Sequence, residues 1–219
     1  MNYQQLLIHH PRLTRSFKKF ILEQEATLDI LSFEKFIESL HEGLIDARIV
    51  LQKVDPGIPR ARKLHQLVDQ EIEQAQNLKA SCQKGCSACC HVEVEITSYE
   101  TEILAQLIIQ GHDVDQLRWS EQCARSVGDP VWKKGSHNLQ NKCLFLNQSG
   151  ECSIYYDRPV MCRRHSVTSP AKLCQTLDAP ISLRYFPRVD LLISAANEDE
   201  GLEIGPLAKM LMTKMQIKT

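Results

Sequence analysis

Cysteine is the residue type whose number and spacing could do chemistry in this chain. Of the nine cysteines, four lie within residues 82–90, four lie within residues 143–174, and Cys123 stands between the two groups. Crowded thiolates repel one another unless a cation compensates their charge. Zinc takes four thiolates, and iron–sulfur clusters are held by about four cysteine sulfurs. The spacing therefore predicts zinc or an iron–sulfur cluster, with the ligands Cys82, Cys86, Cys89, Cys90, Cys143, Cys152, Cys162 and Cys174.

Clustered thiols can also have roles other than metal binding. A lone cysteine usually behaves as a small buried hydrophobe, and paired thiols can do reversible redox chemistry. Eight thiols in two tight groups favour a metal, whereas Cys123 is predicted to be unrelated to it. The adjacent Cys89 and Cys90 diverge in direction, which indicates two metal sites, or one ligand beside a redox or structural thiol. His91 and His165 could each supply a nitrogen ligand and are left outside the predicted set.

The compartment affects how clustered thiols are interpreted. The N-terminal residues lack a basic segment followed by an apolar core and a small-residue cleavage site, so we expect no secretion signal. No apolar run reaches the roughly 18 residues of a membrane span. We therefore expect a cytoplasmic protein. In a reducing cytosol such thiols are metal ligands or redox groups more often than disulfides.

Composition limits the classes of partner. The chain has 219 residues, of which 43% are hydrophobic and 24% are charged, as in an ordinary globular protein. Its 26 basic residues are balanced by 27 acidic ones, and no block of five or more like charges occurs. A protein without an excess of positive charge has little long-range attraction for polyanions. Nucleic acid is therefore not expected as a partner.

The first 80 residues predict helices that act as a scaffold. Apolar residues recur at steps of three and four over residues 13–25, over residues 32–53 and from Leu64 onward. If the last helix continued, the cysteines of residues 82–90 would share one helical face. Gly85 favours a turn instead, because glycine is unfavourable inside a helix. Both geometries bring the thiols close together.

Shorter elements are predicted beyond the first cysteine group. Residues 92–96 alternate between apolar and acidic, as in a brief strand. Thr97 and Glu100 have the spacing of a capping box, and Gly111 is placed to end the helix that follows. Residues 112–142 read as a loop with a short helix near 115–125, and residues 143–155 as two arms around a turn. Pro187 and Pro206 could each open a helix.

Together these signals predict a mainly α protein. We expect a helical bundle, an irregular cysteine-rich metal-binding region and a small amount of β structure. The predicted organisation is an N-terminal helical region over residues 1–80, a metal-binding domain over residues 81–178, and C-terminal helices over residues 179–219 that pack on the core. The N-terminal helices could present a protein partner.

The cysteine motifs resemble a known family. The pattern Cys82-x-x-x-Cys86-x-x-Cys89-Cys90-His91 is followed by Cys143-x-Phe145-Leu146, by Gly150-x-Cys152-Ser153-Ile154-Tyr155 and by Arg158-Pro159-x-x-Cys162-Arg163. This arrangement resembles the YkgJ-like cysteine-cluster family over about residues 82–175. Ser166 and Cys174 occupy positions where relatives also have serine and cysteine. Many members have two residues between the first two cysteines, whereas this chain has three.

The resemblance implies chelation of zinc or iron and little more. Flagellin lysine methylases are similar only distantly, and their activity is not transferred to this chain, which lacks a glycine-rich nucleotide loop and a nucleophile–base pair. Arg158 and Arg163 could offset the charge of a thiolate centre, although Arg158 could instead cap the turn before Pro159. Three functions stay open: metal handling or electron transfer, an iron–sulfur enzyme of protein modification, and a zinc-stapled interaction module.

Overall fold

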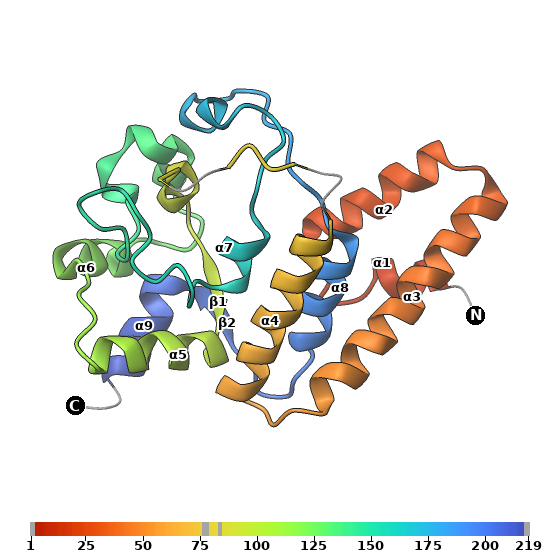
Figure 1. The fold of residues 1–219 in the computed structure, drawn as a ribbon, viewed down its shortest axis with the longest axis horizontal. Coiled ribbons are helices and arrows are strands. Elements are labelled where there is room, and N and C mark those ends of the chain that lie inside the picture. Colours follow the sequence, from red (N-terminus) through yellow and green to blue (C-terminus); the bar gives the residue numbers. More distant parts are fainter. Residues whose placement is uncertain (1–2, 76–78, 83–84, 217–219) are drawn as a thin grey trace. The chain divides into compact units, whose positions relative to one another are not determined.

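The structure is a computed structural model that describes residues 3–75, 79–82 and 85–216. The chain divides into two compact units, one of Met1–Gln74 with Tyr185–Leu202 and one of Ala75–Arg184 with Glu203–Thr219. The residues expected as a C-terminal helical region are therefore shared between the two units. Helices dominate, and the described β structure is one small two-stranded sheet, so the mainly α fold is confirmed (Figure 1).

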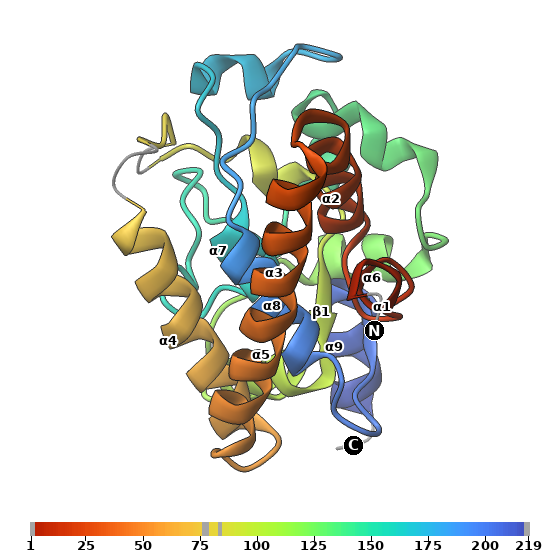
Figure 2. The ribbon, with the colours of Figure 1, turned by 90° about the vertical axis from the view of Figure 1, so that its right-hand side faces the viewer.

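The first unit is a helical bundle. Its most buried helix is α8, in which every residue from Val189 to Ala196 is buried. α3 and α4 pack against α8 (Figure 2). A Cβ at Gly43 of α3 would lie 2.9 Å from Leu191 Cδ1, so glycine permits the close approach of these two helices. The helices of this unit are α1 (Tyr3–Ile8), α2 (Arg15–Thr27), α3 (Ile30–Gln52), α4 (Ile58–Gln74) and α8 (Pro187–Ala196).

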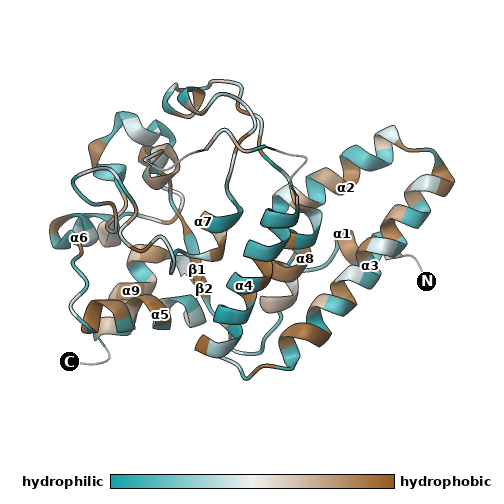
Figure 3. Cartoon of the chain, in the orientation of Figure 1, coloured by the Kyte–Doolittle hydropathy of each residue, from teal (hydrophilic) through white to brown (hydrophobic). Residues whose placement is uncertain are grey.

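The amphipathic stripes of this bundle match the predicted ones. The helices expected at residues 13–25 and 32–53 are α2 and α3, and Pro187 opens α8 as expected. Polar and apolar residues alternate along α2 and α3 (Figure 3). The hydroxyl of Thr14 and the carboxylate of Asp29 cap these two helices by accepting from Phe17 N and Ser32 N. The described part of this unit brings no cysteine into its core.

The second unit contains the sheet. Strand β1 (Glu95–Thr97) pairs antiparallel with β2 (Ile204–Pro206), with Ile96 opposite Gly205. The predicted capping box is present: Thr97 Oγ1 accepts from Glu100 N, and Glu100 Oε2 accepts from Thr97 N. The other elements are η1 (Ala88–His91), α5 (Ser98–Ile109), α6 (Gln116–Ala124), η2 (Pro130–His137), η3 (Leu139–Asn141), α7 (Val160–Arg164), η4 (Ala171–Gln175) and α9 (Leu207–Gln216).

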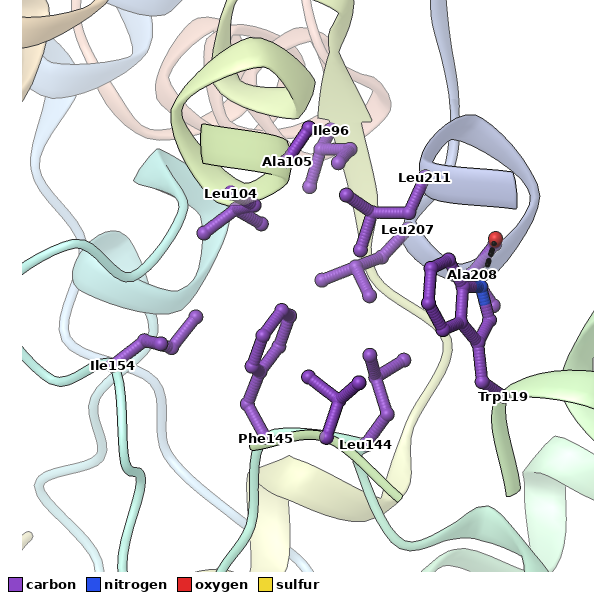
Figure 4. Packing of buried hydrophobic residues seen from close by; sticks show 11 residues of the cluster. Ile96, Leu104, Ala105, Trp119, Leu144, Phe145, Ile154, Leu207, Ala208 and Leu211 are labelled. Carbon is purple, nitrogen blue, oxygen red and sulfur yellow. Dashed lines mark hydrogen bonds between the residues drawn. The ribbon is translucent and has the colours of Figure 1, made fainter. Parts of the chain in front are cut away.

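An apolar cluster joins the sheet, α5 and α9 to the second cysteine segment. Phe145 and Ile154 point into this cluster from the segment that carries Cys143 and Cys152 (Figure 4). Trp119 closes one side, and its Nε1 donates to Ala208 O at 2.9 Å. Burying large apolar side chains here stabilises the segment by about 2 kcal/mol for each residue. The cluster therefore fixes the backbone on either side of these two cysteines.

Among the described residues, no helix combines the length and apolar composition needed to cross a lipid bilayer.

Candidate metal centre

The first cysteine group lies on irregular backbone. α4 ends at Gln74, and the described residues 79–82 and 85–87 are not helical. Gly85 has a φ of 86°, a left-handed conformation that favours glycine. Cys89 and Cys90 lie in the short 3-10 helix η1. The alternative of a continuous helix with four sulfurs on one face is therefore wrong, and a turn takes its place.

Backbone hydrogen bonds tie the second cysteine group to the first. Cys143 N donates to Cys90 O at 2.7 Å, which places the start of the second segment directly beside η1. The chain then turns back on itself at residues 147–150, and Leu146 forms an isolated antiparallel bridge with Cys152. The two predicted arms around a turn are thus present. They bring Cys143 and Cys152 to neighbouring positions.

Cys162 is positioned by the capping glutamate of α5. Glu100 is 2% exposed, and its Oε1 accepts from Val160 N at 2.7 Å, at the first residue of α7. Its Oε2 accepts from Thr97 N at 3.0 Å and from the Thr97 hydroxyl at 3.1 Å. One carboxyl group thus caps α5 and anchors α7, which carries Cys162. The sequence predicted the first role of Glu100, and no local signal indicated the second.

Cys82 lies beside the segment that follows α7, and Cys174 lies on an element that packs against η1. Val167 N approaches Cys82 Sγ at 3.4 Å, Ser81 N donates to Val167 O at 2.8 Å, and the Ser81 hydroxyl donates to Thr168 O at 2.9 Å. Cys174 belongs to η4, which packs against η1. The segment before β1 and the segment after α7 therefore run beside each other.

Cys89 and Cys90 are coupled through a hydrogen bond between their side chains. That bond lowers the pKa of Cys89 to about 7, against a raising effect of burial and with help from the Arg158 guanidinium. The same bond raises the pKa of Cys90, and burial and the neighbouring thiols raise it further. A shared proton explains the opposite directions, because Cys90 keeps the proton that stabilises a thiolate at Cys89.

The thiols of the second group are close enough to Cys89 for their charges to interact. Burial raises the pKa of Cys143 to about 11, and Cys152 and Cys89 add to it. Burial also raises the pKa of Cys162 well above its ordinary value, with contributions from Cys143, Cys89 and Cys152. Burial raises the pKa of Cys152 as well, and the charge of Cys89 raises it further. The two cysteine groups, separated by about fifty residues of sequence, therefore converge.

The remaining thiols interact mainly with one another. Burial raises the pKa of Cys174, and Cys82, Cys86 and Cys89 raise it further. Burial raises the pKa of Cys86, with smaller effects from Cys82 and Cys89. All eight clustered cysteines are half-buried and none is in a disulfide. Without a cation, several neutral thiols are thus held together, which is the state that a metal would deprotonate.

Arg158 is a cation whose charge acts on two of the clustered thiols. Its guanidinium lowers the pKa of both Cys89 and Cys152. The guanidinium carbon lies 4.1 Å from the centre of the Tyr155 ring. Arg158 Nε is buried and has no hydrogen-bond acceptor among the described residues. A buried donor without an acceptor is uncommon, so Arg158 Nε is available to a bound group that could accept a hydrogen bond.

Arg163 plays a different part from Arg158. It is 7% exposed, its Nε donates to Arg158 O at 2.9 Å, and a second nitrogen donates to Tyr156 O. These bonds fix the backbone that leads from Tyr155 to α7. Arg163 therefore supports the position of Arg158 and Cys162 through the main chain.

Three residues outside the predicted set have other environments. His91 is buried with Nδ1 3.0 Å from Ser87 O. Burial lowers the pKa of His165, so that imidazole favours its neutral form. Cys123 packs against the apolar cluster of Figure 4, and its Sγ donates to Ala208 O at 3.2 Å. The side-chain hydrogen bond of Cys123 is thus made to the backbone of α9 rather than to another cysteine.

The donor set fits a thiolate-bound metal. In the part of the chain that the structure describes, no group of three or more His, Cys, Asp or Glu side chains has the spacing of an assembled metal site. The chemical type of the donors nevertheless suits a metal site, because soft sulfur ligands bind zinc and iron–sulfur clusters. Arg158, whose charge acts on Cys89 and Cys152, also has a buried Nε without an acceptor among the described residues, and an anionic sulfur could accept a hydrogen bond from it. Small movements of side chains would have to complete the ligand geometry.

Comparison with curated proteins and with solved structures gives no match. One family model does match the chain, over residues 81–179, slightly less than half of its length. Its description is "Putative zinc- or iron-chelating domain", and its short name, CxxCxxCC, writes out the pattern of the first cysteine group. This chain departs from that pattern by one extra residue between Cys82 and Cys86. The resemblance to a cysteine-cluster family, predicted from the cysteine spacing, is thus confirmed, because the model of this zinc- or iron-chelating family matches residues 81–179.

Proposed function

We propose that this protein holds zinc or an iron–sulfur cluster through its clustered cysteine thiolates and acts in metal handling or electron transfer. The observation that carries the proposal is the convergence of thiols from two distant stretches, with Cys143 bonded through its backbone to Cys90. Crowded thiolates repel one another, and a bound cation removes that repulsion. The candidate ligands are Cys82, Cys86, Cys89, Cys90, Cys143, Cys152, Cys162 and Cys174.

Elemental analysis of the anaerobically purified full-length protein tests the proposal and identifies the metal. Brown protein with iron and a matching amount of inorganic sulfide would support a cluster and a role in electron transfer or iron handling. Colourless protein with bound zinc would support a structural or zinc-handling centre. Protein that retains neither metal, and takes up neither on reconstitution under reducing conditions, would contradict the proposal.

Arg158 should stabilise the loaded centre. The guanidinium influences Cys89 and Cys152, and its Nε–H is free to donate to a sulfur. We expect Arg158→Met to weaken metal binding by about 10- to 100-fold, the range seen when groups behind metal ligands are removed. Arg158→Lys should recover part of the loss because it keeps the charge. Competition with a chromophoric chelator measures both affinities.

The matched control for Arg158 is Arg125. Its guanidinium also stacks on an aromatic ring, 4.5 Å from the centre of Trp132, but it donates to Asn141 Oδ1 and Gln140 O. Arg125→Met removes the same kind of stacking without touching a thiol. Equal losses of metal affinity in Arg125→Met and Arg158→Met would show that Arg158 only supports the local structure.

A further inference from the structure

We propose that a basic face of the second unit docks a partner protein through an acidic surface of that partner. The face is formed by η2 and η4, and its cations are Lys133, Lys134 and Lys172. We call it the η2–η4 face. The inference goes beyond the proposed function, and it rests on that function only for what the two proteins would exchange, which is metal or electrons.

Positive charge is concentrated in three segments that carry seven of the eight clustered cysteines. Residues 79–92, 124–143 and 158–175 contain ten lysines and arginines and one acidic residue, Asp129. The whole chain has 26 basic and 27 acidic residues, so the remainder of the chain is acidic overall. Charge that is balanced over the chain but concentrated on one part of it creates a local field, which steers a partner of opposite charge.

Packing brings parts of these three segments together. η1 lies in the first segment, η2 in the second and η4 in the third, and each of these elements packs against the other two. His137 Nε2 of η2 donates to Gln175 O, at the end of η4, at 2.7 Å. The structure thereby brings Lys133 and Lys134 to the same part of the molecule as Lys172.

Buried contacts fix the backbone of η2. Asn141 is fully buried, and its Nδ2 donates to Val131 O at 2.9 Å and to Gly135 O at 3.2 Å. Arg125 donates to Asn141 Oδ1 at 2.9 Å and holds this amide in place. The two lysines of η2 are therefore carried by an ordered backbone, and a preformed surface loses less conformational freedom when it binds a partner.

The three lysines have no carboxylate partner in the part of the chain that the structure describes. All three are exposed, and no ion pair involves them. Asp129 and Glu93 instead accept from backbone N–H groups at or just before the start of η2, at 2.9 and 3.0 Å. Glu151 and Asp157 interact with other groups, and Asp178, beyond η4, forms no ion pair with the lysines. Carboxylates of a partner could therefore pair with these cations.

Exposed apolar side chains border the lysines. Val127 and Leu139, on either side of η2 in the sequence, are 64% and 76% exposed, and Leu177, which follows η4, is 51% exposed. A protein interface combines apolar contacts with a polar rim, whereas nucleic acid and free phosphate are bound chiefly through charge. Apolar groups beside unpaired cations therefore favour a protein as the partner.

The η2–η4 face borders the candidate metal ligands. Lys172 and Cys174 both belong to η4, and η1, which carries Cys89 and Cys90, packs against both elements of the face. A protein docked here would hold its own metal-binding or redox group close to these thiols. Attraction between opposite charges speeds the encounter of two proteins without requiring a large buried area, which suits transfer between them.

Binding of an acidic peptide to the full-length protein tests the docking face. The probe is a fluorescein-labelled peptide of repeated Glu-Glu-Leu triplets, and the same peptide with glutamine in place of glutamate is its neutral reference. Fluorescence anisotropy should show binding of the acidic peptide alone, and the binding should weaken as salt is added. Combining Lys133→Glu, Lys134→Glu and Lys172→Glu should weaken it by about 10-fold or more, because three attractive pairs become repulsive.

Lys35 and Lys53 provide the matched control. Both are exposed lysines of the first unit, and neither forms an ion pair with a described residue. Lys35→Glu combined with Lys53→Glu also makes the protein more acidic, but it should change peptide binding by less than about 2-fold, because screening weakens distant charges. Lys172→Glu alone gives a second variant of the face, and circular dichroism checks that every variant is folded.

Three results would overturn the docking face. The first is an acidic peptide that does not bind, or that loses affinity equally in the control. The second is a single-stranded oligonucleotide of equal charge that binds the same lysines more tightly than the peptide does. The third is a large fall in the metal content of the triple variant, which would show that the lysines only balance the charge of the thiolates. Wild-type protein that binds the peptide at these lysines but holds neither zinc nor iron would overturn the proposed function and leave the docking face standing.

Discussion

Replacing Cys162 by serine is expected to weaken metal binding by about 100-fold or more. Four thiolates share a binding free energy of about 10 to 16 kcal/mol, so one ligand contributes about 3 kcal/mol, and each 1.4 kcal/mol is a factor of ten. Serine is a poor substitute, because its hydroxyl does not ionise near neutral pH. Cys162 lies on α7, which Glu100 holds in place, so another thiol cannot easily replace it. The amount of metal retained after dialysis against a chelator measures the effect.

Cys123→Ser is the matched control for Cys162→Ser. Both positions are half-buried, and both substitutions exchange sulfur for oxygen. The serine hydroxyl at position 123 can still donate to Ala208 O, so little stability should be lost. Metal content should stay at the wild-type level. If Cys123→Ser and Cys162→Ser lost metal equally, the loss would reflect damage to the fold rather than removal of a ligand.

Signals between neighbouring residues allowed most helices to be predicted. The capping box of Thr97 and Glu100 needs only residues three apart, and the structure contains it. The bond from Val160 N to Glu100 Oε1 joins residues far apart in the sequence, and nothing near either residue indicates it. The sequence therefore predicts that Cys162 lies near the other thiols, but it does not predict how Cys162 is held there.

The end of α4 shows how tertiary contacts override a periodic pattern. Its apolar stripe suggested a helix that might reach Cys82, yet α4 ends at Gln74. Ser81 instead bonds to Val167 O, and Cys82 Sγ faces Val167 N. Because helix preference amounts to less than about 1 kcal/mol per residue, such contacts can outweigh it. Gly85 was the one local signal that correctly favoured a turn.

Strand β2 was missed because its residues are poor strand formers. Gly205 and Pro206 are both unfavourable in strands, and Pro206 was interpreted only as the start of a helix. The helix does begin immediately afterwards, at Leu207. Proline is tolerated in β2 because a two-stranded sheet has only edge strands. The pairing with β1 places α9 against α5, which completes the apolar cluster behind Cys143 and Cys152.

The loaded and metal-free proteins should respond to pH in opposite directions. In the metal-free protein the pKa of Cys143 is raised from 9.0 to about 11, so folding favours its protonated thiol. That contribution to the free energy of unfolding is complete below pH 9.0 and is lost as the pH rises through about 11. It amounts to about 3 kcal/mol, since each pKa unit corresponds to 1.36 kcal/mol. Cys90 and Cys162 shift in the same direction and add to the loss.

Bound metal reverses this dependence, because its ligands must be thiolates. Protons compete with the metal for sulfur, so the loaded protein should lose metal and stability as the pH falls and keep both as the pH rises. Urea unfolding of the two forms across the range from neutral to alkaline pH measures the difference. Cys143→Ser should reduce the alkaline loss of stability in the metal-free protein, since serine has no proton to lose there, while the part due to Cys90 and Cys162 should stay. Metal-free protein that became more stable between pH 9.0 and about 11 would contradict the buried, protonated thiol on which this expectation depends.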